Sequence, residues 1–172
     1  MKTLLFAICS LFITGCVGSP RGVTTVDGFD LERYLGTWYE IARLDHRFER
    51  GLSKVSASYT KRNDGGIDVL NRGFNRQTGI WKEAKGRAYL VGTSNKASLK
   101  VSFFWPFYAG YNIIDLDRND YQYALVCGPN KNYLWILART KHIEKSVVEG
   151  LVAKADEYGF EIKNLIFVDH GN

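Results

Sequence analysis

The stretch Gly36-Thr37-Trp38-Tyr39-Glu40-Ile41 marks the point at which the sequence changes its pattern. Just before it, residues 30–35 have the composition of a short helical turn with Asp30 as its N-cap, and Gly36 ends that turn. From there to about residue 139, short runs of β-forming residues are separated by turn residues at regular spacing. The stretch therefore opens a predicted all-β region.

Eight runs in this region have the composition of strands: residues 38–43, 54–61, 67–75, 81–91, 98–104, 111–116, 121–127 and 133–138. Short turn sequences connect them, such as Asn63-Asp64-Gly65-Gly66. Because strands joined by tight turns pair with their neighbours, the pattern predicts an all-β fold, an eight-stranded antiparallel up-and-down β-barrel. Composition leaves an open sandwich as the alternative.

Alternation separates the two faces of several predicted strands. In residues 98–104 the apolar Leu99, Val101 and Phe103 alternate with polar residues, and one strand face repeats every second residue. An eight-stranded barrel is just wide enough to be filled by side chains or to hold one small ligand. The alternation gives these candidates for the cavity wall, each of which could equally be plain core: Val55, Tyr59, Val69, Ala88, Leu99, Val101, Phe103, Tyr111, Tyr123 and Trp135.

After the barrel the hydrophobic period changes. Residues 143–158 follow the 3,4 spacing of an amphipathic helix, and Gly159 ends the pattern. We expect this C-terminal helix to pack on the barrel wall. Residues 165–168 predict a short last strand that pairs with the first one.

The N-terminus has the features of an export signal. Lys2 precedes an apolar run that is too short to span a membrane, so residues 1–15 are interpreted as a signal peptide. Ile13-Thr14-Gly15-Cys16 resembles the bacterial lipobox, which predicts lipidation of Cys16; a plain signal peptide with a coincidental cysteine is the alternative. Residues 16–28 are then a lipidated N-terminus and tether, and residues 29–172 the folded domain.

Charge and cysteine content exclude several classes of protein. The net charge of +5 becomes +4 without Lys2, and the basic residues form no long run, which argues against nucleic-acid binding. Cys9 lies in the signal and Cys16 is the predicted lipid site, so Cys127 alone remains and no internal disulfide is expected.

Three short motifs carry a family resemblance. Gly36-Thr37-Trp38 matches the Gly-x-Trp signature of lipocalins, Asn119-Asp120-Tyr121 stands where that family has Thr-Asp-Tyr, and Arg139 ends the eighth predicted strand where the family has its arginine. With the lipobox, the whole chain resembles the bacterial outer-membrane lipoprotein lipocalins. The resemblance implies a lipid-anchored protein of the outer membrane in which Trp38 and Arg139 form the barrel floor. Asn119 departs from the family threonine, which leaves the detail of that turn open.

Signals for catalysis are sparse. His46, His142 and His170 form no metal-like pair, and no nucleophile or phosphate-loop motif is present. Asp45-His46 is interpreted as a solvated pair in a loop. We therefore expect no catalytic residue, no metal and no cofactor; an enzyme that uses His46 or Cys127 inside the barrel is a less favoured alternative.

The loop between the first two strands is the candidate rim of the barrel mouth. Phe48 and Leu52 are expected to close over an apolar ligand, and Arg47 and Arg50 to meet an anionic head group. The resemblance implies that the ligand is a fatty acid or lysophospholipid, which the protein binds and stores or transports without turnover. The alternative is a structural lipoprotein in which the aromatic residues 105–108 mediate homodimerisation or membrane contact.

Overall fold

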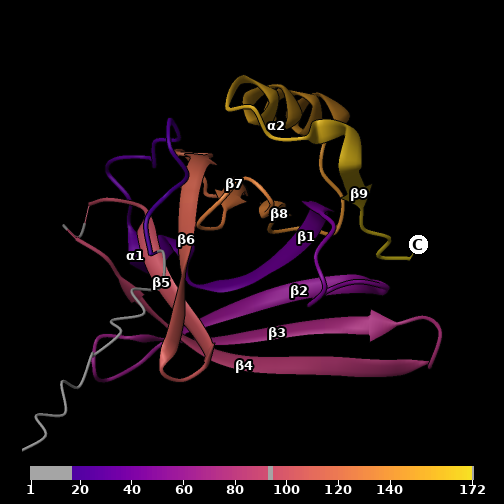
Figure 1. Cartoon of the computed structure of the whole chain (residues 1–172), viewed down its shortest axis with the longest axis horizontal. Coiled ribbons are helices and arrows are strands. Elements are labelled where there is room, and N and C mark those ends of the chain that lie inside the picture. The colour runs from indigo at the N-terminus through magenta and orange to yellow at the C-terminus, as the bar shows by residue number, and fades with distance from the viewer. Residues whose placement is uncertain (1–16, 93–94, 172) are drawn as a thin grey trace, which may run out of the picture.

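A closed β-barrel dominates the computed structural model, which describes residues 17–92 and 95–171 (Figure 1). Consecutive strands pair antiparallel, and β1 also pairs with β8, which closes the ring of eight. The barrel predicted from the sequence is confirmed, and the open sandwich is excluded. The strands are β1 (Gly36–Leu44), β2 (Leu52–Lys61), β3 (Ile67–Asn75), β4 (Ile80–Leu90), β5 (Ser98–Phe104), β6 (Phe107–Leu116), β7 (Tyr123–Cys127) and β8 (Leu134–Ala138).

Strand β1 has three partners. One of its edges pairs with β2 near Gly36 and with β9 (Leu165–Phe167) near Leu44, so the predicted last strand does pair with the first. The other edge pairs with β8 and has a bulge between Glu40 and Ala42. Such an extra residue shifts the alternation of the strand, and Glu40 and Arg43 consequently both point into the barrel.

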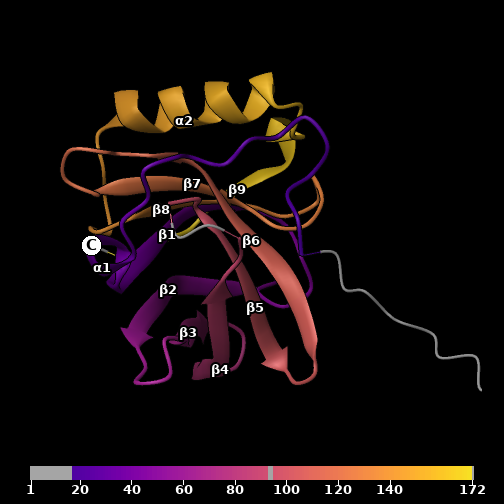
Figure 2. The same cartoon turned by 90° about the vertical axis from the view of Figure 1, so that its left-hand side faces the viewer.

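Helix α2 (Lys145–Glu157) covers the outer face of β7, β8 and β1 (Figures 1 and 2). Its buried residues Leu151 and Ala155 pack against outward-facing residues of these strands, such as Leu125 and Ile136. The 3,4 spacing of the sequence arises from this contact. Within the described residues, no helix is long and apolar enough to cross a membrane.

The short helix α1 (Leu31–Tyr34) lies across one end of the barrel. Asp30 caps it, because its side chain accepts hydrogen bonds from the backbone amides of Glu32 and Arg33. Tyr34 stacks on Trp38 with ring centroids 4.7 Å apart, and Trp38 is fully buried. Residues 30–38 thus form part of the closed end.

Residues 17–28, expected as a tether, lie against the barrel. The Val26 amide donates to the carbonyl of Ile113, and the Val26 carbonyl accepts from Ala97. Further upstream, the Val17 carbonyl oxygen lies 2.6 Å from the position that a Cβ on Gly110 would occupy. Only glycine at position 110 allows Val17 to lie this close to β6.

The barrel wall opens between β4 and β5 at the end opposite α1. Their pairing runs from Leu90 with Leu99 to Arg87 with Ser102 and then stops, so Ile80–Gly86 has no partner on β5. The β5–β6 hairpin bends away here, and β6 begins at Phe107, four residues earlier than predicted. The consecutive aromatic residues of this hairpin lack the alternation that would have marked a strand.

Candidate functional site

The closed end of the barrel has a floor made by Trp38 and Arg139. The Arg139 guanidinium carbon lies 3.9 Å from the centre of the Trp38 ring. Arg139 also donates to the backbone carbonyls of Thr37 at 3.0 Å and Arg33 at 2.7 Å. The Trp38 indole N–H donates to the Tyr34 carbonyl at 2.8 Å. These contacts join β1, β8 and α1, which makes the pair structural.

A chain of three hydroxyl groups lies above this floor. The Tyr111 oxygen is 2.7 Å from that of Tyr34 and 2.9 Å from that of Tyr59. Burial is the largest cause that raises the pKa of all three phenols. The chain therefore stays neutral and provides hydrogen-bonding groups inside an otherwise apolar core.

A small cavity of about 40 Å³ remains above the hydroxyl chain. Four predicted wall residues line it: Val55, Tyr59, Tyr111 and Trp135. The other residues around it are Glu40, Glu49, Ser56, Ala57, Asn71 and Leu137. The cavity is about the size of one or two water molecules, well below the 300 Å³ or more typical of ligand pockets.

The other predicted wall residues differ in position. Val69, Ala88 and Leu99 are buried in the interior core, and Val101 and Phe103 pack against it. Tyr123 was predicted to face the interior, and that prediction is wrong: it packs in the outer cluster beneath α2. Both faces of β7 are apolar because α2 covers the outer one, so alternation could not identify the inner face.

The predicted mouth loop connects β1 to β2 at the end opposite Trp38. Phe48 is 59% exposed and has the Arg47 guanidinium 5.0 Å from its ring centre. Arg50 points to solvent and pairs with Asp45 at 2.7 Å. Leu52 is partly buried at the start of β2. The two arginines lie at the rim, outside the cavity.

Glu49 of the same loop points into the barrel and fills the mouth. Its carboxylate accepts a hydrogen bond from the Trp135 indole at 3.1 Å and lies 3.0 Å from His46 Nε2. Arg43 donates to Glu40 Oε1 at 2.6 Å and to the carbonyls of Glu49 and Leu52. The loop is thus held over the mouth by polar contacts.

The two carboxyl groups of this cluster have opposite pKa shifts. Burial, followed by the nearby Glu49 charge, raises the pKa of Glu40 well above its usual value despite Arg43. Contacts with His46 and Trp135 lower the pKa of Glu49 although the group is buried. Of the two, Glu40 is therefore the carboxyl group that takes up a proton more readily, and Glu49 the one that keeps its negative charge.

Sequence reasoning missed most of this cluster. Glu40 stands two residues after Trp38, so the period-2 signal places it inside, but a charged residue is an unexpected interior group. The inward position of Arg43 depends on the bulge, which the sequence does not reveal. The interpretation of His46 as solvated is wrong: it is 7% exposed and packs against Phe48, Tyr133 and Trp135.

A plugged floor, a mouth covered by the loop between β1 and β2, and a mainly apolar interior define a small β-barrel that is closed at one end. Residues 29–170 match the lipocalin-like domain family, and the chain therefore belongs to the lipocalin family. Lipocalins bind small hydrophobic ligands, and the family indicates binding or transport rather than catalysis.

Similar proteins agree with this assignment. The chain is 51% identical to the outer membrane lipoprotein Blc of Vibrio cholerae, over 98% of both chains. It is 56% identical to the outer membrane lipoprotein Blc of Escherichia coli K12, over 87% of this chain and 84% of that one. Insecticyanin from the tobacco hornworm Manduca sexta has the same fold with a TM-score of 0.69 at 20% identity, over 90% of this chain and 88% of that one. The relatives confirm the predicted location, a lipid-anchored protein of the outer membrane.

Proposed function

We propose that this lipocalin binds one single-chain lipid, a fatty acid or a lysophospholipid, in its barrel and stores or transports it without chemical turnover. The observation that carries the proposal is the construction of the mouth. Large apolar residues stand exposed around it, including Phe48 on the loop and Ile80 at the start of β4. Surfaces of this kind mark ligand or membrane contacts in soluble proteins.

The cavity is small because the mouth of the barrel is closed in this structure. Glu49 and its loop occupy the entrance through polar contacts, which water can replace when the loop moves out. Ala84, on the inward-facing side of β4, is exposed because the wall is open there, and an acyl chain can enter beside it. Each buried methylene adds about 0.8 kcal/mol, so a long acyl chain offsets the cost of moving one loop.

Polar groups at the mouth suit the head of such a lipid. Asn71 lines the cavity, and its side-chain oxygen is buried without a hydrogen-bond partner among the described residues. Arg47 and Arg50 at the rim would meet an anionic head group once the acyl chain is inside. An eight-stranded barrel has room for one chain, which favours single-chain lipids over diacyl lipids.

Three further points belong to the same proposal. Cys16, outside the described residues, is the site of the lipid anchor, and residues 16–28 connect that anchor to the domain. Catalysis is not part of the function. A homodimer through the aromatic β5–β6 hairpin is the alternative role of that surface.

A substitution that fills the cavity tests the proposal. Ala57 lines the void, and Ala57→Leu adds more side-chain volume than the 40 Å³ available. We expect this variant to bind a fluorescent fatty acid at least about tenfold more weakly, a loss of about 1.4 kcal/mol. Ala153→Leu, on an exposed position of α2, is the matched control and should bind like the natural chain.

The readout is displacement of the fluorescent fatty acid by lysophospholipid, with far-UV circular dichroism to show that both variants are folded. Equal affinity for both variants would place the lipid outside the barrel. Absence of binding to the natural chain would refute the proposal outright.

A further inference from the structure

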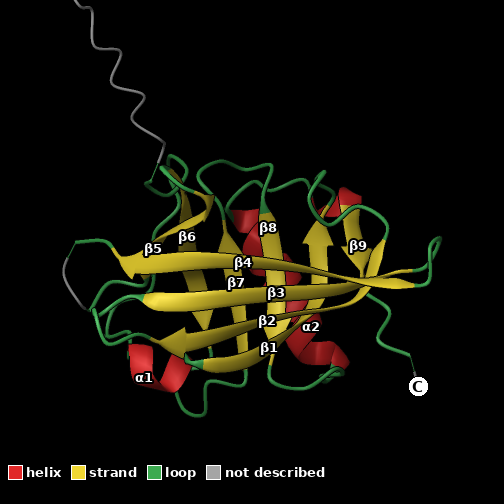
Figure 3. Cartoon of the chain, turned by 90° about the horizontal axis from the view of Figure 1, so that it is seen from below, coloured by secondary structure: helices red, strands yellow, loops and turns green. Residues whose placement is uncertain are grey.

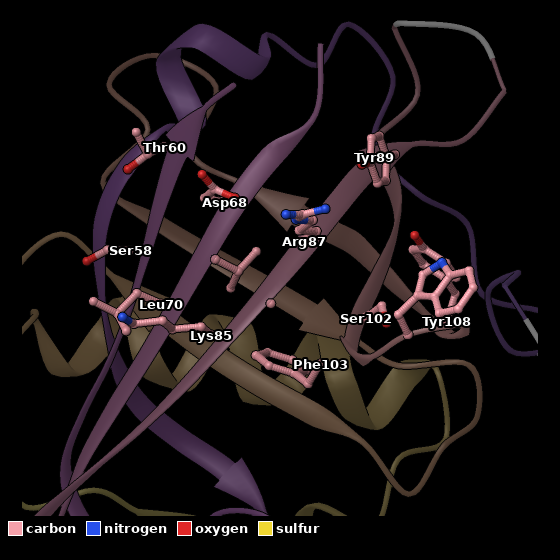
Figure 4. A pocket seen from close by; sticks show the side chains of 13 residues that line it. Ser58, Thr60, Asp68, Leu70, Lys85, Arg87, Tyr89, Ser102, Phe103 and Tyr108 are labelled. Atoms are coloured by element: carbon pink, nitrogen blue, oxygen red, sulfur yellow. The ribbon is translucent and has the colours of Figure 1, made fainter. Parts of the chain in front are cut away.

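A groove of about 660 Å³ lies on the outside of the barrel, separate from the ligand cavity. It follows the outer face of β2, β3 and β4 and is bounded by the β5–β6 hairpin (Figure 4). Figure 3 shows these strands on the side of the barrel facing away from α2. Phe103 lies between the groove and the interior core, since it contacts both.

The polar residues of the groove are suited to an anionic group. Lys85 and Arg87 project from β4 and have no ion-pair partner among the described residues. The acidic residue of the groove, Asp68, is paired with Arg62 at 2.9 Å. The charge available to a ligand is therefore positive.

Ser102 gives a second, independent indication of a ligand. It lines the groove, is 8% exposed, and its hydroxyl has no hydrogen-bond partner in the described part of the chain. A buried hydroxyl without a partner costs free energy, so such groups usually meet a ligand or water. The hydroxyl groups of Ser58 and Thr60, on β2, line the opposite side of the groove (Figure 4).

Aromatic side chains stand beside these polar groups. At the hairpin tip, Phe104 is 74% exposed, Trp105 is 83% exposed and Phe107 is 63% exposed. Lys100 lies near the rings of Tyr89 and Tyr108, which also line the groove. Tryptophan and tyrosine next to lysine and arginine are typical of protein surfaces at the membrane–water interface.

The start of the described chain lies close to the groove and the β5–β6 hairpin. Val17 rests on Gly110, on the outer face of β6 and two residues along the strand from Tyr108. Successive residues of a strand are about 3.3 Å apart, so this point is about 7 Å from Tyr108 along β6. A lipid on Cys16, the next residue upstream, would enter the bilayer close to the groove.

We infer that this face docks on an anionic phospholipid bilayer, with one head-group phosphate held by Arg87 and Ser102, another met by Lys85, and the hairpin tip inserted among the lipids. The contact orients the anchored barrel on the membrane. It is a lipid site separate from the interior cavity and does not depend on the ligand proposed there. The position of the chain start favours a bilayer over a second copy of the chain.

Vesicle flotation tests the docking surface with the chain carrying Cys16→Ser, which cannot be acylated at that position. Vesicles of phosphatidylglycerol and phosphatidylethanolamine should bind this chain. A basic residue near a charged membrane contributes about fivefold in affinity, so Lys85→Ser with Arg87→Ser should weaken binding about 25-fold. The matched control, Lys145→Ser with Lys163→Ser, removes the same charge at exposed positions outside the groove.

A second pair of variants tests the aromatic tip. Trp105→Ser should weaken binding about tenfold, whereas Phe167→Ser removes a similarly exposed ring on β9 without effect. On vesicles of neutral phosphatidylcholine, the effect of Trp105 should remain and the effect of the two charges should disappear.

Three results would overturn the inference. The first is no vesicle binding, and the second is an equal loss of vesicle affinity in the groove and control variants. The third is a Trp105→Ser chain that no longer self-associates in sedimentation but binds vesicles as before. The last result would assign the hairpin to a dimer. Ligand binding inside the barrel should be the same in all these variants, which separates this test from that of the proposed function.

Discussion

Replacing Arg43 by methionine removes the cation that ties the mouth loop to the barrel interior. Arg43 is 2% exposed and forms an ion pair with Glu40, which is 3% exposed. It also donates to the carbonyls of Glu49 and Leu52. Each carbonyl left without its donor costs about 1 kcal/mol, and breaking a buried ion pair costs about 3–5 kcal/mol.

Glu40 can take up a proton once its cation is gone, so loss of the pair should cost only about 1–2 kcal/mol. With the two carbonyls, the total should be about 3–4 kcal/mol of unfolding free energy. Urea unfolding followed by tryptophan fluorescence measures this. Arg50→Met is the control: its ion pair with Asp45 is exposed, and the loss should be below about 0.5 kcal/mol.

A double-mutant cycle with Glu40→Gln isolates the contact between the two side chains. The combined variant should be more stable than the sum of the single losses predicts, by about 1 kcal/mol, since glutamine needs no cation. Additive losses of unfolding free energy, or a loss below about 1 kcal/mol in Arg43→Met alone, would refute the claim that polar contacts of Arg43 hold the loop in place.

Three further outcomes are expected. Arg139→Met should lower the free energy of unfolding in urea by about 2–4 kcal/mol, because the stacking on Trp38 and the hydrogen bonds to carbonyls disappear. Arg139→Lys should lose less. Unchanged stability in Arg139→Met would show that these floor contacts do not stabilise the fold. The pKa of Glu40 is raised in the folded chain, so the stability that this group contributes should be lost as the pH rises above the normal glutamate value of 4.5 toward the raised pKa. Glu40→Gln should therefore flatten this pH dependence of the urea midpoint. Burial raises the pKa of Cys127 to about 12, so in a chain carrying Cys9→Ser and Cys16→Ser, Ellman's reagent at pH 8 should modify Cys127 only after unfolding; rapid modification of the folded chain would contradict its burial.

Alternation and turn composition predicted the eight strands and most of their inner faces, but not the aromatic start of β6. In β5, Leu99 and Val101 face the core as their spacing indicates, because polar residues occupy the opposite face. The same rule fails where a second apolar layer covers the barrel, as the outward position of Tyr123 beneath α2 shows. The hydrophobic period gives the two faces of a strand but not what covers the outer one.

The polar cluster at the mouth needed information that a linear pattern lacks. The inward position of Arg43 follows from one bulge, and the burial of Glu49 follows from the path of a loop. The raised pKa of Glu40 reflects both of them, because the Glu49 charge raises it and Arg43 opposes that rise. Such long-range arrangements of charge arise only when the barrel closes.

The measurement that tests the central claim most directly is native mass spectrometry of the chain carrying Cys16→Ser, purified from bacterial cells without detergent. The account predicts one bound mass per chain that matches a fatty acid or a lysophospholipid, and its loss in Ala57→Leu. A ligand-free mass that stays unchanged after either lipid is added would contradict it.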